Sequence, residues 1–224
     1  MSTSVIKTLQ KIILRLIRAI LIVLILVIGT TYGWKLSNPS PTNITNHEIS
    51  QRLKESVHIL SENIGIRNYA YFENLEKAAS YIETSLKDIG YSVEEWSYDV
   101  DGQQFKNIVT RIKNNNTEEY ILIGAHYDSC FNPGADDNAS GIAGLLELAR
   151  LLKKESLKTN IMFVAFTNEE PPFFQTDKMG SRIFVRTLQE KGIKIKATVV
   201  LEMIGFYSKK EFSQKYLPLL GSFY

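Results

Sequence analysis

Three short apolar runs, separated by segments with helical spacing, constrain the fold of this chain more than any other feature. Residues 120–125, 160–166 and 197–203 have the length of strands and predict buried ones. Between them, residues 141–153 and 179–191 predict helices. Strands that alternate with helices indicate an α/β sheet covered on both faces. Sheets of this kind place their ligand sites beyond the carboxyl ends of their strands.

The part of the chain before these runs adds two helices and two strands. Apolar residues at spacings of three and four predict helices over 48–64 and 73–89. The pattern then changes, and residues 91–100 and 105–112 predict strands on either side of a short turn. Residues 47–224 are therefore predicted to form one α/β domain.

The first 35 residues differ from the rest. Residues 19–34 carry no charge, and a helix of about 20 apolar residues can span the core of a bilayer. Four basic residues and no acid precede this run, which favours a cytoplasmic amino terminus. We therefore expect a cytoplasmic basic segment and transmembrane signal anchor at 1–35, a linker at 36–46, and a domain at 47–224 outside the cytoplasmic membrane. A cleaved signal peptide and a buried helix of a soluble protein are the alternatives.

The charge of the exported part excludes one class of partner. Five of the 26 basic residues lie in residues 1–35, which contain no acid, so the remainder carries 21 basic against 24 acidic residues, a net charge of −3. Binding to nucleic acid needs a basic surface and is not expected. Cys130 is the only cysteine, which excludes a disulfide within the chain, and we predict a structural role for it. The sequence leaves the oligomeric state open.

One histidine and several acids follow the predicted strands. The stretches AHYDS and NEEPP come directly after the first and second strands, LEMIG spans the end of the third, and PGADDNASG precedes the helix at 141. Crowded carboxylates repel one another unless some take up protons, and a divalent cation removes this conflict. Histidine with aspartate and glutamate is a ligand set that suits zinc. The candidate residues are His126, Asp128, Asp136, Asp137, Glu169, Glu170 and Glu202.

Each candidate also has a simpler explanation. His126 alone would be a buried structural histidine, and the adjacent glutamates alone would be a solvated turn. Asp136 and Asp137 precede an apolar helical segment, where an acid commonly caps the helix. Glu202 could pair with a lysine. The metal site is favoured because separate simple explanations do not predict that all of these residues fall at strand ends.

Four separated segments carry a resemblance to a known family. They read GAHYDS, PGADDNASGIAGLLELARLL, FTNEEPPFFQTDKMGS and LEMIGFYS, and they span about residues 121–208. In their order and spacing they resemble the M28 family of zinc aminopeptidases and their carboxypeptidase and glutaminyl cyclase relatives. The resemblance implies an α/β domain with a mixed central sheet flanked by helices, and a pair of zinc ions bridged by one aspartate.

The resemblance also implies which residues hold metal. His126 and Glu202 become ligands of one zinc ion, and Glu170 becomes a ligand of the other. Asp136 becomes the carboxylate that bridges the two ions. A non-proline cis peptide bond, which the family has after its bridging aspartate, is expected at Asp136–Asp137.

Two further residues are implied to act without holding metal. Glu169 becomes the general base, which takes a proton from the attacking water and delivers it to the leaving amine. Asp128, two residues after His126, becomes the group that fixes the tautomer and orientation of that imidazole.

The chain departs from the family pattern in two places. Glu202 stands where many relatives have aspartate, although a glutamate can also coordinate zinc. The family takes its last ligand, a histidine, from a loop after the LEMIG segment, and no histidine follows His126 in this chain. We therefore expect a fragment or truncated product of an M28 domain, incomplete at its carboxyl terminus. It should hold one zinc ion well instead of two and show little peptidase activity.

The sequence therefore predicts a membrane-anchored zinc exopeptidase, and within that class an aminopeptidase. Its expected partners are a peptide substrate and, through the amino-terminal helix, a lipid bilayer. A glutaminyl cyclase that uses a single zinc ion is the alternative enzyme, because the tandem glutamates fit either activity. A non-catalytic binding domain on the same fold is the alternative from another class. Substrate specificity is not readable from these motifs.

Overall fold

The computed structural model describes residues 17, 20–23, 47–114, 117–208 and 210. The chain divides into two compact units, residues 1–45 and 46–224. Among the described residues, none of the helices combines the length and the apolar character that crossing a bilayer requires. The predicted anchor lies outside the described residues, apart from the helical residues 17 and 20–23, so it stays a prediction together with the three-part division of the chain.

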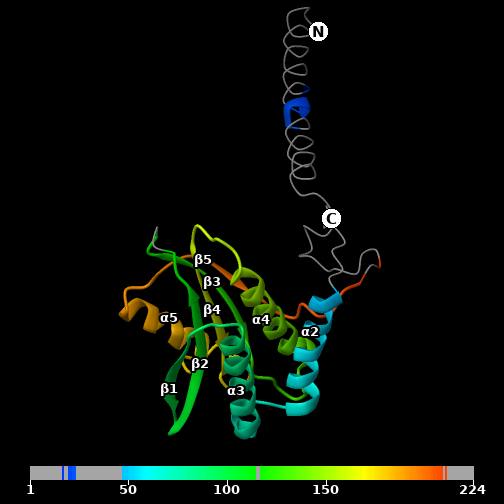
Figure 1. Ribbon diagram of the computed structural model, residues 1–224, viewed down its shortest axis with the longest axis vertical. Helices are drawn as coiled ribbons and strands as arrows, with labels where there is room; N and C mark the ends of the chain where they lie inside the picture. The colour runs from blue at the N-terminus through cyan, green and yellow to red at the C-terminus, as the bar shows by residue number, and fades with distance from the viewer. Residues whose placement is uncertain (1–16, 18–19, 24–46, 115–116, 209, 211–224) are drawn as a thin grey trace, which may run out of the picture. The chain divides into compact units, whose positions relative to one another are not determined.

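The second unit is built on a five-stranded sheet (Figure 1). Its strands lie in the order β1-β2-β4-β3-β5. β2 pairs antiparallel with β1 and β4, whereas β3 pairs parallel with β4 and β5. The predicted mixed sheet is therefore confirmed. The strands are β1 (Val93–Val100), β2 (Gln103–Ile112), β3 (Glu119–His126), β4 (Asn160–Phe166) and β5 (Lys194–Val200).

Helices cover both faces of this sheet. α3 and α4 pack on one face with α2 against α4, and α5 lies on the other face (Figure 1). The helical elements are α2 (His47–His58), the π-helical turn η1 (Ile59–Ile64), the 3-10 turn η2 (Tyr69–Tyr71), α3 (Phe72–Asp88), the turn η3 (Ala135–Ser140), α4 (Gly141–Leu152) and α5 (Gly180–Glu190). The helix predicted over 48–64 thus ends in a π-helical turn.

The position of the last strand corrects the prediction. β5 covers Lys194–Val200, where the sequence favoured 197–203. The β-branched part of this segment pairs with β3, and the last such contact is the hydrogen bond from Leu201 N to Gly124 O, 2.8 Å long. From that point the backbone bonds to the turn η3 instead. Glu202 therefore belongs to a loop and not to the strand.

The burial of β4 shows why its sequence is a continuous apolar run. Side chains alternate between the two faces of a strand. Ile161, Phe163 and Ala165 join the core cluster under α3 and α4, whereas Met162, Val164 and Phe166 join the cluster under α5. All seven residues are buried. Helices on both faces leave no place on this strand for a polar side chain that faces water.

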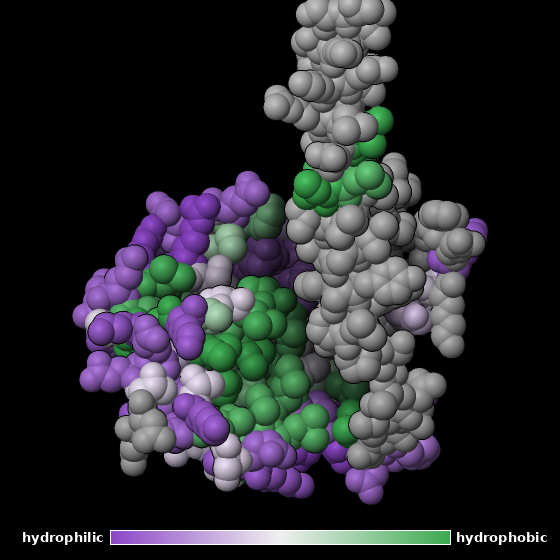
Figure 2. Space-filling view, turned by 90° about the horizontal axis from the view of Figure 1, so that it is seen from above, coloured by the Kyte–Doolittle hydropathy of each residue, from purple (hydrophilic) through white to green (hydrophobic). Residues whose placement is uncertain are grey.

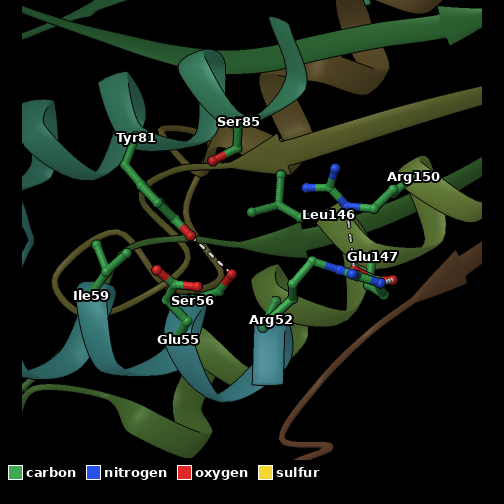
Figure 3. Close-up of a pocket in the computed structure, with 10 residues that line it drawn as sticks. Arg52, Glu55, Ser56, Ile59, Tyr81, Ser85, Leu146, Glu147 and Arg150 are labelled. Atoms are coloured by element: carbon green, nitrogen blue, oxygen red, sulfur yellow. Dashed lines mark hydrogen bonds and ion pairs between the residues drawn. The ribbon is translucent and has the colours of Figure 1, made fainter. Parts of the chain in front are cut away.

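Polar contacts tie α2 to the other helices of its face. Arg52 of α2 donates to Glu147 of α4 through both Nε (2.9 Å) and Nη2 (2.7 Å), as Figure 3 shows. The Tyr81 hydroxyl of α3 donates to Ser56 Oγ of α2 at 2.9 Å. These residues line a cavity of about 210 Å³ between the three helices. Because Glu147 in its wall is paired with Arg52 and Arg150, these charged groups serve the packing of the helices.

Apolar side chains stay exposed along β5 and the segment that follows it. Figure 2 shows hydrophobic residues gathered in a broad area of one face, bordered by hydrophilic ones. Exposed patches larger than a few hundred Å² commonly mark contact surfaces. The large exposed hydrophobic residues of this segment are Val199, Val200, Met203, Ile204, Phe206 and Tyr207.

Candidate metal centre

The carboxyl ends of three parallel strands bring the predicted residues together. His126 is the last residue of β3 and is 3% exposed. Its Nε2 atom lies 3.1 Å from Asp137 Oδ1, 3.4 Å from Glu202 Oε1 and 3.8 Å from Glu169 Oε2. Glu169 follows β4, Glu202 follows β5, and Asp137 comes from η3. One imidazole nitrogen therefore faces three carboxylates from three different segments.

Two overlapping groups of these side chains lie close enough together to hold a metal ion. One is His126, Asp137 and Glu202; the other is His126, Glu169 and Glu170. Within each group the potential ligand atoms lie within 4.8 Å of one another. A set of one imidazole nitrogen and carboxylate oxygens suits zinc, which takes nitrogen and oxygen ligands in catalytic sites.

The electrostatics of the cluster also fit a cation. Burial raises the pKa of Glu170 to about 7 and raises that of Glu169 above its ordinary value, and the neighbouring acids add to both shifts. Burial opposes a charge on His126, yet the nearby carboxylates of Asp128, Asp137 and Glu202 raise its pKa from 6.5 to about 12. The cluster thus favours positive charge at its centre. A divalent ion meets this requirement with the residues present.

Asp128 connects the end of β3 to the loop after β4. Its side chain is 2% exposed, and Oδ1 lies 3.4 Å from His126 Nδ1, which is buried without a hydrogen-bond partner in the described part of the chain. Oδ1 accepts a hydrogen bond from Glu169 N (3.2 Å), and Oδ2 accepts one from Glu170 N (2.9 Å). Sequence reasoning missed these two bonds. They place the backbone of both glutamates relative to His126.

The predicted bridging residue, Asp136, does not face His126. Its Oδ1 accepts hydrogen bonds from Gly205 N at 2.8 Å and Ser140 Oγ at 3.1 Å, and the residue lines a cavity beside α2. Asp137 lies beside His126, in the place where Asp136 was expected. The expected cis bond at Asp136–Asp137 is wrong, because the cis bond joins Asp137 to Asn138.

The backbone of η3 explains why Asp137, and not Asp136, faces His126. Gly134 adopts a left-handed conformation (φ 61°), and an added Cβ there would collide with the Asp137 carbonyl oxygen. Asp137 itself is not helical (φ −105°, ψ 93°). Consecutive side chains therefore leave the turn in different directions, so that Asp136 and Asp137 face different neighbours.

Asn138 forms hydrogen bonds with Glu202, the remaining ligand candidate, and with the backbone beside it. Its Nδ2 donates to Leu201 O at 3.0 Å and Glu202 Oε2 at 3.2 Å, and its Oδ1 accepts from Met203 N at 3.2 Å. The Glu202 side chain is 46% exposed, in contrast to His126. Sequence reasoning gave Asn138 no role in the site, and no local signal marks its bonds to a loop more than 60 positions away.

Comparison with known proteins adds a family to this geometry. Residues 107–220 match the profile of peptidase family M28. The chain belongs to peptidase family M28. The predicted resemblance to its zinc metallopeptidases is thereby confirmed, as is the α/β fold with a mixed central sheet.

Individual M28 relatives differ in what their names state. The chain is 38% identical to uncharacterized protein YfbL of Escherichia coli over 179 residues, which is 76% of this chain and 54% of that protein. It is 37% identical to aminopeptidase YwaD of Bacillus subtilis over 107 residues, 46% of this chain and 22% of that one. The structure of Porphyromonas gingivalis glutaminyl cyclase superposes with a TM-score of 0.58 and 26% identity, covering 70% of this chain and 58% of that one. The chain thus spans about half the length of YfbL and less of YwaD.

Proposed function

We propose that this M28 chain is the metal-binding part of a zinc exopeptidase that removes amino-terminal residues from peptides. The observation that carries the proposal is the cluster at the carboxyl ends of β3, β4 and β5, where potential ligand atoms lie within 4.8 Å of one another. The likeness to an aminopeptidase of Bacillus subtilis supports the choice of reaction.

His126, Asp137 and Glu202 are the residues proposed to hold zinc. They supply one nitrogen and two oxygen ligands from three segments, and Asp137 replaces Asp136 in the expected ligand set. Glu170 belongs to the second group, which contains no histidine other than His126. We therefore propose one well-held zinc ion per chain, in agreement with the sequence prediction.

Glu169 is the proposed general base. Its Oε2 lies 3.8 Å from His126 Nε2, and the rise in its pKa through burial brings its proton affinity closer to neutral pH. Bound zinc would supply Lewis acidity, which lowers the pKa of a water molecule and polarises the scissile carbonyl. Glu169 would take the proton of the attacking water and pass it to the departing amine. Asp128 would keep Glu169 in place through the hydrogen bond to its backbone N–H.

A glutaminyl cyclase activity is the second candidate. The structural match to the Porphyromonas gingivalis glutaminyl cyclase favours it, and a cyclase that uses a single zinc ion agrees with the single site proposed for this chain. In that reaction Glu169 would carry a proton from the α-amine to the leaving amide nitrogen of an amino-terminal glutamine. The two activities need the same residues and differ in the substrate.

Replacement of the proposed base tests the function. Glu169→Gln keeps the shape of the side chain and removes its proton acceptor, and Glu190→Gln, at the exposed end of α5, serves as the matched control. Dialysed protein should contain about one zinc ion per chain in all three forms. Slow release of amino-terminal leucine should fall roughly 10²- to 10⁴-fold in Glu169→Gln alone.

The alternatives give different results in the same assay. Turnover of a peptide with amino-terminal glutamine, but not leucine, would point to the cyclase. Zinc-loaded wild-type chain that converts neither peptide would support the non-catalytic binding domain. A wild-type chain without zinc, or Glu169→Gln with wild-type turnover, would overturn the proposal.

A further inference from the structure

Arg67 has a side chain that is completely buried. It lies in the loop between η1 and η2, and its exposed fraction is 0%. Arginine is almost never fully buried unless its charge and its donors are satisfied, because removing a charged group from water is costly. The surroundings of this side chain must therefore compensate for its burial.

Backbone carbonyl groups provide the compensation. Arg67 Nε donates to Tyr127 O (2.7 Å), Nη1 donates to Pro133 O (2.5 Å) and Nη2 donates to Gly134 O (3.2 Å). Nη1 also donates to Leu60 O (3.1 Å) and Gly65 O (3.2 Å). The salt bridges found among the described residues do not include Arg67. One guanidinium group therefore joins three stretches of backbone.

Two of these stretches carry the metal centre. Tyr127 lies between His126 and Asp128, and Gly134 accepts the hydrogen bond from Ala139 N (3.1 Å) that closes the turn around Asp137. The main chain of Arg67 also pairs with the segment after β3, since Ser129 N donates to Arg67 O at 2.8 Å. The Arg67 side chain thus connects the backbone next to His126 with the backbone of the loop that leads to Asp137.

The charge of Arg67 adds to this geometry. Burial lowers its pKa to about 10, while Asp128, Asp137 and Glu170 act in the opposite direction, so the guanidinium stays protonated at neutral pH. A permanent positive charge therefore lies close enough to Asp128, Asp137 and Glu170 to interact with their carboxylates. It offsets part of their mutual repulsion before any metal binds.

We infer that Arg67 is a positioning residue of the metal centre, which sets the spacing of the His126 and Asp137 backbones through its bonds to Tyr127, Pro133 and Gly134. The inference rests on the proposed function, in which His126 and Asp137 hold zinc. A role in stability alone would make Arg67 one more packed side chain. The two roles differ in what happens to metal binding when the protein stays folded.

Two substitutions in the full chain test the role, with a third as the matched control. Arg67→Lys keeps the charge but offers one ammonium group with three donors, which cannot serve five carbonyl oxygens in the fork geometry of a guanidinium. Arg67→Met removes the charge as well. Arg52→Met removes the arginine that bridges α2 and α4, away from the centre.

Zinc affinity and the absorption spectrum of the cobalt-substituted protein are the two measurements that a merely structural role would leave unchanged. Both Arg67 variants should bind zinc roughly 10- to 100-fold more weakly, as losses of outer partners of a metal site typically do, and their cobalt bands should shift. Arg52→Met should lower the melting temperature and leave both measurements at wild-type values. Folded Arg67→Lys with wild-type zinc affinity and cobalt bands would overturn the inference. If Arg67→Met does not fold, Arg67→Lys alone serves as the test.

Hydrogen exchange in the metal-free proteins tests the role of Arg67 independently of whether the chain binds zinc. Backbone amides of residues 127–139 should exchange faster in Arg67→Lys than in the wild type, and those in Arg52→Met should not. A wild-type chain that binds no zinc would defeat the proposed function, yet this comparison would still decide whether Arg67 orders the two loops. Unchanged exchange over 127–139 in Arg67→Lys would count against it.

Discussion

β4 and β5 flank β3 and run parallel to it, yet their surroundings are opposite. All seven residues of β4 are buried, whereas six of the seven residues of β5 are exposed and the other is partly buried. α5 and the helices of the opposite face enclose β4 between them. β5 is the edge of the sheet within the described part of the chain. Two strands that pair in the same direction with the same strand thus differ in burial: helices enclose β4, whereas β5 is exposed.

The same contrast extends into the candidate metal centre. After β4, the backbone of both glutamates is fixed by Asp128, which is 2% exposed. After β5, Glu202 lies 46% exposed and depends on hydrogen bonds from Asn138. The β4 side of the centre is therefore ordered by hydrogen bonds to a buried carboxylate, and the β5 side by hydrogen bonds from η3 to an exposed one. Disturbing each side in turn should produce effects of different kinds.

Asp136 and Asp137 are adjacent in η3 but face different neighbours. Their substitution should give the largest difference in zinc affinity. Asp137 faces His126, whereas Asp136 binds the loop after β5 through Gly205 N. Asp137→Asn should weaken zinc binding by more than about 100-fold, because losing a ligand costs more than the roughly 10- to 100-fold loss seen for outer partners. That factor corresponds to more than about 2.7 kcal/mol.

Asp136→Asn is the matched variant for this comparison. It should weaken zinc binding by no more than the roughly 10- to 100-fold typical of outer partners, because the hydrogen bonds of its carboxylate in the described part of the chain go to Gly205 N and Ser140 Oγ. Competition with a chelator measures both affinities. A reversed order, with Asp136→Asn the weaker binder, would restore Asp136 as the bridging ligand and contradict the geometry of η3.

The fold was predictable where the sequence pattern reflects burial on two faces. The runs that became β3 and β4 are apolar because helices cover both of their faces, and the acids that follow them lie at the predicted edge. The residues at the end of β3 and after β4, including His126 and Glu169, were placed correctly for the same reason. A strand end is visible in the sequence as the change from apolar to polar residues.

Three features were not predictable because their causes are not local. Which of Asp136 and Asp137 faces His126 depends on the conformation of η3, and Gly134 alone does not reveal it. Arg67 binds carbonyl oxygens up to 67 positions away, so no pattern around it distinguishes a buried arginine from an exposed one. The end of β5 was misplaced because its apolar run continues past Val200 into the exposed loop.

Identical substitutions on either side of Gly124 should measure the contrast in packing. Gly124 pairs in register with Val164 of β4 and with Val200 of β5, which are 0% and 60% exposed. Val164→Ala should lower the free energy of unfolding by about 2 kcal/mol, through lost apolar burial and the cavity that remains. Val200→Ala should change it by less than about 0.5 kcal/mol. Urea denaturation followed by circular dichroism measures both.

Equal losses for the two valines would show that β5 is covered in solution. A further chain or a second copy packed on the exposed face would then have to be sought, and the loss for Val200→Ala should depend on protein concentration if a second copy is responsible.

A smaller effect than those of Asp137→Asn and Val164→Ala is expected from the hydrogen bonds between Asn138 and the loop after β5. Asn138→Ala removes the donor to Glu202 and the acceptor for Met203 N, which leaves the third proposed ligand free to move. Zinc affinity should fall by about tenfold, which corresponds to about 1.4 kcal/mol. Isothermal titration of the metal-free protein with zinc measures this change.

Asn160→Ala provides the control at the opposite end of the sheet. Asn160 is buried like Asn138 and donates to the backbone at Thr117 O and Glu119 O, but it begins β4 instead of following β5. Both variants lose buried hydrogen bonds and should unfold at lower temperature. Only Asn138→Ala should bind zinc more weakly. If Asn160→Ala lost affinity to the same degree, the loss would follow from general destabilisation, and the polar bonds of η3 would have no specific part in holding Glu202.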